Sequence, residues 1–381
     1  MKWIFIEPED VWFFRDARAF VKGGGYSTAK IIFPPSPQTV TGALRSLILG
    51  NYPNLDMTKF ETGADKDLYR RIGKPGDLGP EFCLRGPFFA RRLGDDILCY
   101  TQLPQDVYYT DQDNHRFGAY HPIERSPFES AWSSQGSALH PLWPPHGQRQ
   151  DGVEEPYWVN SYGVDDYLAY REFGALLQSE LFVVSPRTGI ERDPDLRIAK
   201  NQMLYTAPFI YLRNYLGLLV GVNDELDLPF EKGLLNLGGE GRAARFQNIP
   251  KDSINFLPSS APANKQRIKI VLTTPAYFED GWHPKDWNWQ AVGLPPGAKL
   301  ISAALGKPQY AGGWDVNRRK PKPMHAFIPA GSVYYFEFSK PLKNSIDLNN
   351  LSFTESPEGE EDYRRMGFGQ CIIGTWDWQT V

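Results

Sequence analysis

Several loops of this sequence combine arginine or lysine with glycine, and these residue types can grip a phosphate chain. Guanidinium groups pair with phosphate oxygens, and glycine lets a backbone approach a ligand closely. The candidate ligand-binding residues in such loops are Arg15, Arg18, Lys22, Arg187, Arg192, Arg197, Lys200, Arg242, Arg245, Arg318 and Arg319. They predict local anion-binding patches.

A plainer interpretation stays open for the longest of these segments. Arg187, Arg192 and Arg197 alternate with acidic residues, Glu191 and Asp193 among them. The segment would then be a solvated loop whose charges pair with one another.

Catalytic motifs are missing from the sequence. It contains no P-loop, no G-x-S-x-G, no H-E-x-x-H and no Cys-x-x-Cys. His115, His121, His140 and His146 lack carboxylates at ligand spacing, so we expect no metal and no cofactor. The three cysteines, which are not in a paired motif, favour a reducing compartment.

Composition narrows the function further. The chain has 381 residues and a net charge of -4, so any nucleic-acid surface must be a local patch, and acidic areas are left for protein partners. The sequence has neither an apolar run of membrane-spanning length nor the layout of a signal peptide. We expect a cytoplasmic protein without membrane contact.

The first fifty residues must position the first basic loop. Residues 3–6 are apolar on both alternating faces, which predicts a central strand that ends at Glu7-Pro8. Ser36 and Pro37 are typical of a helix start, and the apolar spacing from Val40 predicts a helix over residues 37–49 that Gly50 stops. Strand, loop and helix form half of a split βαβ unit, and an anionic ligand would lie at the helix N-terminus.

The rest of the chain predicts short strands with long connections. We expect a hairpin over residues 82–100, an insertion without regular structure at 104–162, strands at 181–184, 205–212 and 216–222, a protruding basic hairpin at 185–203, and a helix end before Gly238. Residues 257–264 are the best linker. A second βαββαβ unit follows, with strands at 267–273, 299–305, 332–338 and 371–376 and a helix ending at Met366.

Seven motifs, in this order, resemble a known family. They are residues 2–16, 33–45 (which end in Gly42-Ala43-Leu44-Arg45), 238–242, 274–282, 313–315, 329–332 and 367–369. This order is similar to that of the third subunit of the Cmr complex, a type III-B CRISPR RNA-guided effector, within the RAMP superfamily. The insertion at 104–162 is the part least covered.

The resemblance implies an α+β fold of two ferredoxin-like, RRM-related domains, here 1–257 and 265–381, with long insertions. It also implies a C-terminal glycine-rich loop, which Gly367, Phe368 and Gly369 match, and it adds Arg45 to the RNA-binding candidates. The hairpin at 185–203 resembles the thumb of related subunits. Such subunits are non-catalytic: they bind the 5′ handle of the CRISPR RNA and dock against the large polymerase-type subunit and neighbouring backbone RAMP subunits.

Two other functions remain open. An endoribonuclease of the same superfamily would need a histidine base, for which His283 and His325 are the candidates. A carbohydrate-binding or glycosidase module would use the many tryptophans and acidic residues.

Overall fold

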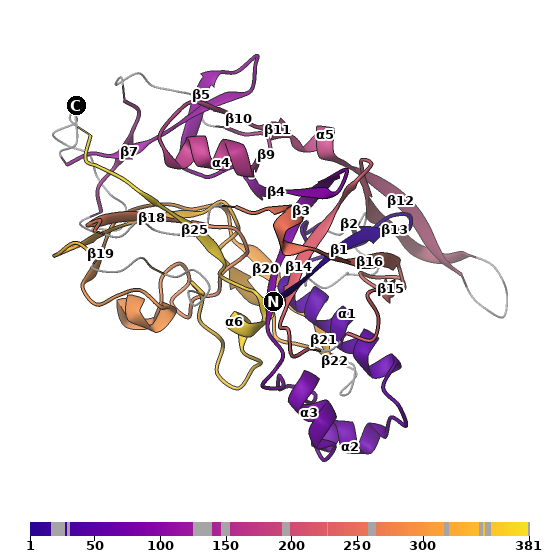
Figure 1. The fold of residues 1–381 in the computed structure, drawn as a ribbon. Helices are drawn as coiled ribbons and strands as arrows, with labels where there is room; N and C mark the ends of the chain where they lie inside the picture. Colours follow the sequence, from indigo (N-terminus) through magenta and orange to yellow (C-terminus); the bar gives the residue numbers. More distant parts are fainter. Residues whose placement is uncertain are drawn as a thin grey trace.

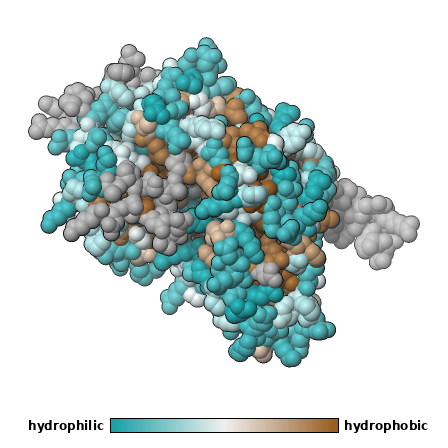
Figure 2. Space-filling model, viewed as in Figure 1, coloured by the Kyte–Doolittle hydropathy of each residue, from teal (hydrophilic) through white to brown (hydrophobic). Residues whose placement is uncertain are grey.

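A nine-stranded and a four-stranded β-sheet, with smaller sheets and helices around them, make up the protein in an α+β fold (Figure 1). The computed structural model describes residues 1–16, 27–28, 31–124, 139–145, 153–192, 199–226, 228–257, 264–315, 320–342, 346 and 352–379. Figure 2 shows brown hydrophobic patches between hydrophilic areas on one face. Most of the large apolar side chains that the structure describes are buried.

The N-terminal sheet has nine strands, in the order β11-β9-β4-β3-β14-β1-β16-β15, with β17 paired to β4. Their bounds are β1 Lys2–Pro8, β3 Leu84–Leu93, β4 Asp96–Gln102, β9 Tyr157–Asn160, β11 Leu176–Leu177, β14 Leu216–Val222, β15 Lys232–Asn236, β16 Ala243–Ile249 and β17 Ile254–Asn255. β1 lies between two antiparallel neighbours and ends at Pro8, which confirms the predicted central strand. β3 and β4 confirm the predicted hairpin.

Helix α1 (Pro37–Gly50) covers one face of this sheet. The Ser36 hydroxyl accepts the Gln38 N–H at 3.3 Å, and Val40, Leu44 and Ile48 join the core formed by alternate residues of β1. The helix begins as predicted, but Gly50 is its last residue rather than its stop, and Asn51 is the C-cap. Two short helices, α2 (Met57–Thr62) and α3 (Lys66–Ile72), follow it.

The insertion at residues 104–162 is more regular than we predicted. It contains β5 Val107–Asp111, β6 Arg116–Ala119, β7 His121–Pro122 and β8 Leu142–Trp143, and it ends in β9, which pairs with β4 in the main sheet. α4 (Ser161–Leu168), β10 (Phe173–Gly174) and α5 (Gln178–Leu181) come next. These strands are so short that alternation of apolar and polar residues cannot be recognised in the sequence. Strand pairing and aromatic packing form them instead.

Residues 232–236 correct another prediction. We expected a helix end before Gly238, but β15 pairs with β16 there. Leu235 and Leu237 are buried at a spacing of two, so strand alternation and sheet pairing override the local apolar run.

β12 (Phe182–Arg192) and β13 (Ala199–Leu212) form one long antiparallel hairpin that projects from the molecule (Figure 1). A protruding hairpin was predicted at 185–203, but its strands extend further, from Phe182 and to Leu212, and the register shifts between Ile190 and Arg192. β2 (Ser27–Thr28) pairs with β13 in parallel.

The C-terminal sheet has the order β19-β24-β18-β25, and every pair is antiparallel. Its strands are β18 Arg267–Leu272, β19 Ala298–Ala304, β24 Val333–Phe338 and β25 Cys371–Thr375, close to the predicted bounds. The smaller elements are η1 Lys251–Ser253, η2 Lys285–Trp287, η3 Trp289–Val292, β20 Gln309–Ala311, β21 Trp314–Asp315, β22 Lys320–Pro321, β23 His325–Phe327 and α6 Tyr363–Met366.

One hydrophobic cluster joins the two sheets. Trp3 and Leu219 of the first sheet are buried together with Val271, Tyr335 and Ile372 of the second. The predicted linker lies mostly outside the described residues, because 258–263 are not among them.

Candidate nucleic-acid interface

The segment that follows β1, residues 9–16, is held between the hairpin and the loop after β15. Trp12 and Ile210 exchange backbone hydrogen bonds, with N–O distances of 3.1 and 2.8 Å. On the other side the Gly239 N–H donates to the Phe13 carbonyl at 2.9 Å. The base of β13, residues 9–16 and the 238–242 loop therefore form one surface.

Two arginines and three aromatic rings meet on this surface. The guanidinium carbons of Arg187 and Arg242 both lie 4.7 Å from the centroid of the Phe209 ring, and the Phe13 ring lies 5.3 Å from it. Arg187 also lies 5.4 Å from the Tyr211 ring and donates to its hydroxyl. We call Phe13, Arg187, Phe209, Tyr211 and Arg242 the arginine–aromatic cluster.

The basic groups of this surface are accessible and only loosely paired. Arg187 is exposed, and the Arg245 side chain is 62% exposed with Glu9 at 3.2 Å. Arg242 is 25% exposed, with the carboxylates of Asp10 at 3.5 Å and Glu240 at 3.6 Å. Surface pairs of this kind contribute about 0–1 kcal/mol, so phosphate oxygens could replace the carboxylates.

The glycines in the 238–242 loop have a structural role here. Gly238 has φ +100°, and a Cβ on it would lie 2.9 Å from the Phe13 carbonyl oxygen. A Cβ on Gly239 would lie 2.7 Å from the Phe13 ring. We expected these glycines to let a binding partner approach closely, but the segment that lies against them is the protein's own.

An open hollow lies beside Arg245, over the face of β1, β16 and β15 that is opposite α1. Its lining residues are Phe5, Glu7, Glu9, Lys232, Gly233, Leu234, Arg245, Phe246 and Gln247. Acidic and basic groups balance there, so the hollow by itself does not select an anion.

Arg45 lies elsewhere, inside the protein. Its side chain is 13% exposed, and its guanidinium donates to Glu361 at 2.6 Å and to the Lys74 carbonyl at 2.7 Å. These groups occupy the guanidinium, so we leave Arg45 out of the candidate interface.

The predicted glycine-rich loop packs at the junction of the two sheets. A Cβ on Gly367 would lie 2.4 Å from the Gly86 carbonyl oxygen, and one on Gly369 would lie 2.6 Å from the Phe353 backbone. Phe368 is 1% exposed and stacks on Phe327 with centroids 4.9 Å apart. We predicted that these glycines let RNA approach the backbone closely, but in this conformation other segments of the chain occupy that space.

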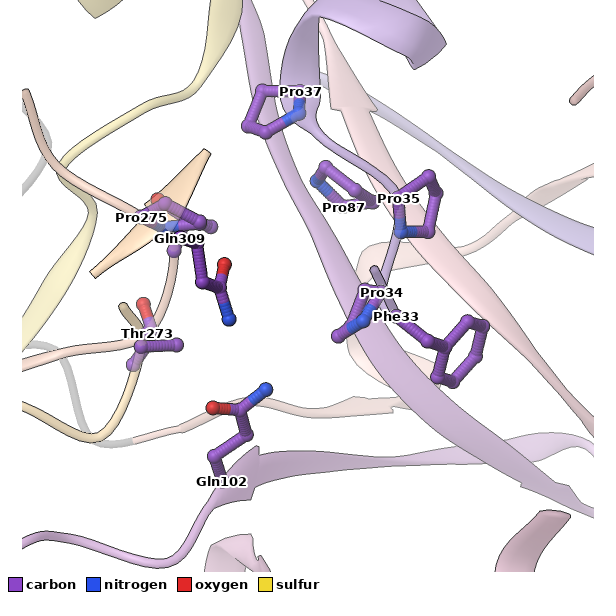
Figure 3. Close-up of a pocket in the computed structure, with 11 residues that line it drawn as sticks. Phe33, Pro34, Pro35, Pro37, Pro87, Gln102, Thr273, Pro275 and Gln309 are labelled. Carbon is purple, nitrogen blue, oxygen red and sulfur yellow. The ribbon is translucent and has the colours of Figure 1, made fainter. Parts of the chain in front are cut away.

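The anion site predicted at the N-terminus of α1 is described only in part, because Arg18 and Lys22 of the preceding loop lie outside the described residues. The crevice beside it is lined by Pro34, Pro35, Pro37 and Pro87 on one side, and by Gln102, Thr273 and Gln309 on the other (Figure 3). No arginine or lysine is among the residues that line it. Proline at the first helical position also removes one of the free N–H donors.

The structure describes the remaining predicted site residues only in part. Arg18, Lys22, Arg197, Arg318 and Arg319 lie outside the described residues. Arg192 and Lys200 belong to β12 and β13, of which only the backbone is described at these positions. Arg15 is exposed two residues beyond Phe13.

Sequence reasoning missed Phe13, Phe209 and Tyr211 as site residues. The signal was in the strand register: Phe209 and Tyr211 share one face of β13, and Arg187 pairs with Ala207 next to them. Aligning the two strands of the hairpin would have brought the basic and aromatic side chains together.

Both candidate histidines have near neighbours. The His325 Nε2 lies 2.7 Å from a Glu360 carboxylate oxygen. The His283 ring stacks on Trp287 at 3.9 Å, and its Nδ1 lies 4.0 Å from Asp280. Each histidine thus lies beside a carboxylate, on the C-terminal sheet side of the molecule.

The sequence matches the model of the family CRISPR-associated protein (Cas_Cmr3) over residues 4–376. The chain belongs to this family. The match extends through both sheets and confirms the resemblance indicated by the seven motifs. A search of curated proteins found no match to this member of the Cas_Cmr3 family.

Solved structures similar to this Cas_Cmr3 family member come from CRISPR complexes. A chain of the "Cryo-EM structure of the Type III-B Cmr-beta bound to cognate target RNA" is 15% identical, with a TM-score of 0.47, and the match covers 87% of this chain and 86% of that one. A chain of the "Crystal structure of Csm3-Csm4 subcomplex in the type III-A CRISPR-Cas interference complex" is 12% identical, with a TM-score of 0.37 and coverages of 99% and 100%.

The described residues lack two kinds of feature, a metal-binding cluster and a membrane-spanning helix. They contain no group of three or more His, Cys, Asp or Glu side chains arranged to hold a metal ion. None of the helices in the described part of the chain is long and apolar enough to span a membrane.

Proposed function

We propose that this Cas_Cmr3 family member is a non-catalytic subunit of a type III-B CRISPR effector complex that binds the 5′ handle of the CRISPR RNA. The observation that carries the proposal is the arginine–aromatic cluster, where the exposed Arg187 and the partly exposed Arg242 lie over the buried ring of Phe209. Family membership supports the biological setting.

The chemistry of the cluster suits single-stranded RNA. Unpaired bases stack on aromatic rings and guanidinium planes, and arginines contact the phosphates between them. Arg187, Arg242 and Arg245 supply charge, while Phe13 and Tyr211 are partly exposed rings. A local patch is enough in a chain with a net charge of -4.

Strand order supports two ferredoxin-like domains. In the N-terminal sheet β16, β1, β14 and β3 are adjacent and antiparallel, and in chain order they are the fourth, first, third and second strands of a split βαβ core. In the C-terminal sheet β25, β18, β24 and β19 repeat this 4-1-3-2 order. The long insertions then lie between core strands, as β4 to β13 do between β3 and β14.

The proposed partners are the large polymerase-type subunit, the backbone RAMP subunits and the CRISPR RNA, in the cytoplasm. A non-catalytic role agrees with the histidine geometry, because His283 and His325 lie outside the arginine–aromatic cluster. RNA held by the cluster would therefore not meet them as general bases.

The test is RNA binding by the full chain and by the double variant Arg187→Gln/Arg242→Gln. We expect the affinity for a handle RNA to fall at least tenfold, and the slope of log affinity against log salt to flatten by about 0.7 per lost phosphate contact. The matched control Arg116→Gln/Arg171→Gln removes two arginines elsewhere that are 42% and 64% exposed and paired with exposed carboxylates, and it should bind as the wild type does.

Equal affinities and equal salt slopes for wild type and double variant would contradict the proposed interface. The endoribonuclease alternative predicts single-turnover cleavage of a repeat RNA that His283→Ala or His325→Ala abolishes. Cleavage of that kind, persisting through repurification, would overturn the non-catalytic assignment.

A further inference from the structure

A second exposed aromatic site lies on the C-terminal side, in residues 279–288, which we call the tryptophan loop. Trp287 is 45% exposed, although tryptophan is usually well buried. Asp286 and Trp287 have φ values of +53° and +57°, so two consecutive residues other than glycine take the left-handed conformation. Such backbone costs about 1–3 kcal/mol per residue, and here it presents the ring to solvent.

Three aromatic rings lie around Trp287, and part of its own ring stays exposed. His283 stacks on it at 3.9 Å with an interplanar angle of 15°, Trp282 lies at 5.3 Å and 89°, and Trp289 lies at 6.3 Å and 67°. With these neighbours in place, 45% of Trp287 still faces solvent. An open indole face is the strongest cation–π acceptor among the aromatic side chains.

Carboxylates lie next to the stacked His283–Trp287 pair in space and in sequence. Asp280 lies 4.0 Å from the His283 Nδ1 and accepts the Asp286 N–H at 3.0 Å, which places it beside the stacked pair. Asp286 directly precedes Trp287 and is exposed. The one lysine of the loop, Lys285, is already paired with Glu279 at 2.8 Å.

Glu355 adds to the negative charge while it fixes the loop. Its carboxylate accepts the backbone N–H groups of Glu279 and Lys285 at 2.9 and 3.2 Å. The loop is thus ordered before any ligand arrives, so binding would not need to order it.

We propose that the tryptophan loop is a docking site for an arginine or lysine side chain in a basic segment of a partner protein. The cation would lie against the exposed part of the Trp287 ring, near the carboxylates of Asp280 and Asp286. Charge complementarity selects this occupant, because the same carboxylates repel RNA phosphates. The site lies on the C-terminal sheet side and does not depend on the proposed RNA interface.

The test uses the full chain labelled with 5-fluorotryptophan and a blocked tetra-arginine peptide as the probe. The ¹⁹F resonance of residue 287, assigned with Trp287→Phe, should shift on titration, while a tetra-citrulline peptide of the same shape should leave it in place. We expect about tenfold weaker binding by Asp280→Asn/Asp286→Asn. Trp287→Ala should bind roughly two- to fivefold more weakly, and Trp287→Phe should recover part of the loss.

The matched control is Asp95→Asn/Asp96→Asn, which removes the same charge from the exposed turn between β3 and β4 and should bind as the wild type does. Melting temperatures of the variants distinguish lost folding from lost binding. Equal affinity of wild type and loop variants for the probe would overturn the proposal. So would a shift of the same resonance with citrulline peptide, with single-stranded RNA, or with protein concentration alone.

Discussion

Among the clusters that place a basic side chain against aromatic rings, two differ sharply in exposure. The Lys269 ammonium lies 3.7 Å from the Tyr167 ring centroid and 4.0 Å from that of Tyr170, with the whole side chain buried. The Arg187 guanidinium makes similar contacts with Phe209 and Tyr211 at the base of the projecting hairpin, but it is exposed.

The buried cluster is a joint between parts of the chain. Asp106 of the insertion accepts hydrogen bonds from Tyr167 at 2.8 Å and from Tyr335 of the C-terminal sheet. Burial lowers the pKa of Lys269 to about 8, although the charge of Asp106 opposes this change. A cation held in this way has no route to a ligand, whereas in the proposed function Arg187 exchanges its partners for RNA. The exposure of a basic side chain, rather than its residue type, decides whether it can reach a ligand.

Glycines also differ in how closely the chain surrounds them, and substituting an enclosed one gives the largest expected effect on stability. Gly367→Ala adds a Cβ that would lie 2.4 Å from the Gly86 carbonyl oxygen, at φ +99°. We expect the free energy of unfolding to fall by roughly 3 kcal/mol or more, because a backbone clash adds to the conformational strain. Denaturant unfolding measures this change.

Gly359→Ala is the control, since Gly359 has φ +77° but its Cβ would meet nothing within 4 Å. It should cost only about 1 kcal/mol. If Gly367→Ala is as stable as this control but binds RNA poorly, the 367–369 loop faces RNA after all.

Sequence reasoning located the elements whose signals are local. Ser36, Pro37 and the spacing from Val40 were sufficient for α1, and the doubly apolar residues 3–6 indicated the central strand. The four strands of the C-terminal sheet were also found. The short strands of the insertion and β15 were not, because their pairing partners are distant: β9 with β4 is an example.

The candidate site was harder to predict than the fold. Sequence identifies arginine in a loop, but whether its guanidinium faces solvent or an internal carboxylate depends on contacts such as Arg45 with Glu361, which are 316 residues apart. Likewise, Phe209 looked like an ordinary strand residue until the hairpin register placed Arg187 beside it. Long-range pairing of this kind leaves no trace in local spacing.

A pH titration sharpens the comparison of the two clusters. Between pH 8 and the ordinary lysine pKa of 10.5, the unfolded chain binds a proton at Lys269 that the folded protein does not, so stability rises with pH there. Lys269→Met lacks this contribution. Relative to that variant, the wild type should therefore gain as much as about 3 kcal/mol across this range.

Subtracting the variant cancels the buried tyrosines, whose raised pKa values give the opposite trend above pH 10 in both proteins. Burial, followed by the charge of Lys269, lowers the pKa of His121 to about 4. His121 therefore stays neutral across this pH range. A pH-independent difference between wild type and variant would show that Lys269 is not buried as a titrating group.

Glu361→Gln tests whether Arg45 is structural. Glu361 is 5% exposed and pairs with Arg45 at 2.6 Å and with Lys322 at 2.8 Å. Removing its charge leaves two partly buried cations uncompensated, which should cost about 2 kcal/mol of stability without changing the salt slope of RNA binding. Glu172→Gln, which breaks the exposed pair with Arg116, should cost less than about 1 kcal/mol. Similar losses for both variants would contradict the buried role.

The smallest expected effect comes from Arg187→Lys, which keeps the charge but removes the planar guanidinium that lies over Phe209 and Tyr211. If Arg187 both contacts phosphate and extends the aromatic stack, the affinity for handle RNA should fall roughly two- to fivefold while the salt slope stays as in the wild type. Stability should change by less than about 0.5 kcal/mol, because the residue is exposed. A flattened slope would mean that lysine cannot reach the phosphate, and unchanged affinity would mean that Arg187 acts through charge alone.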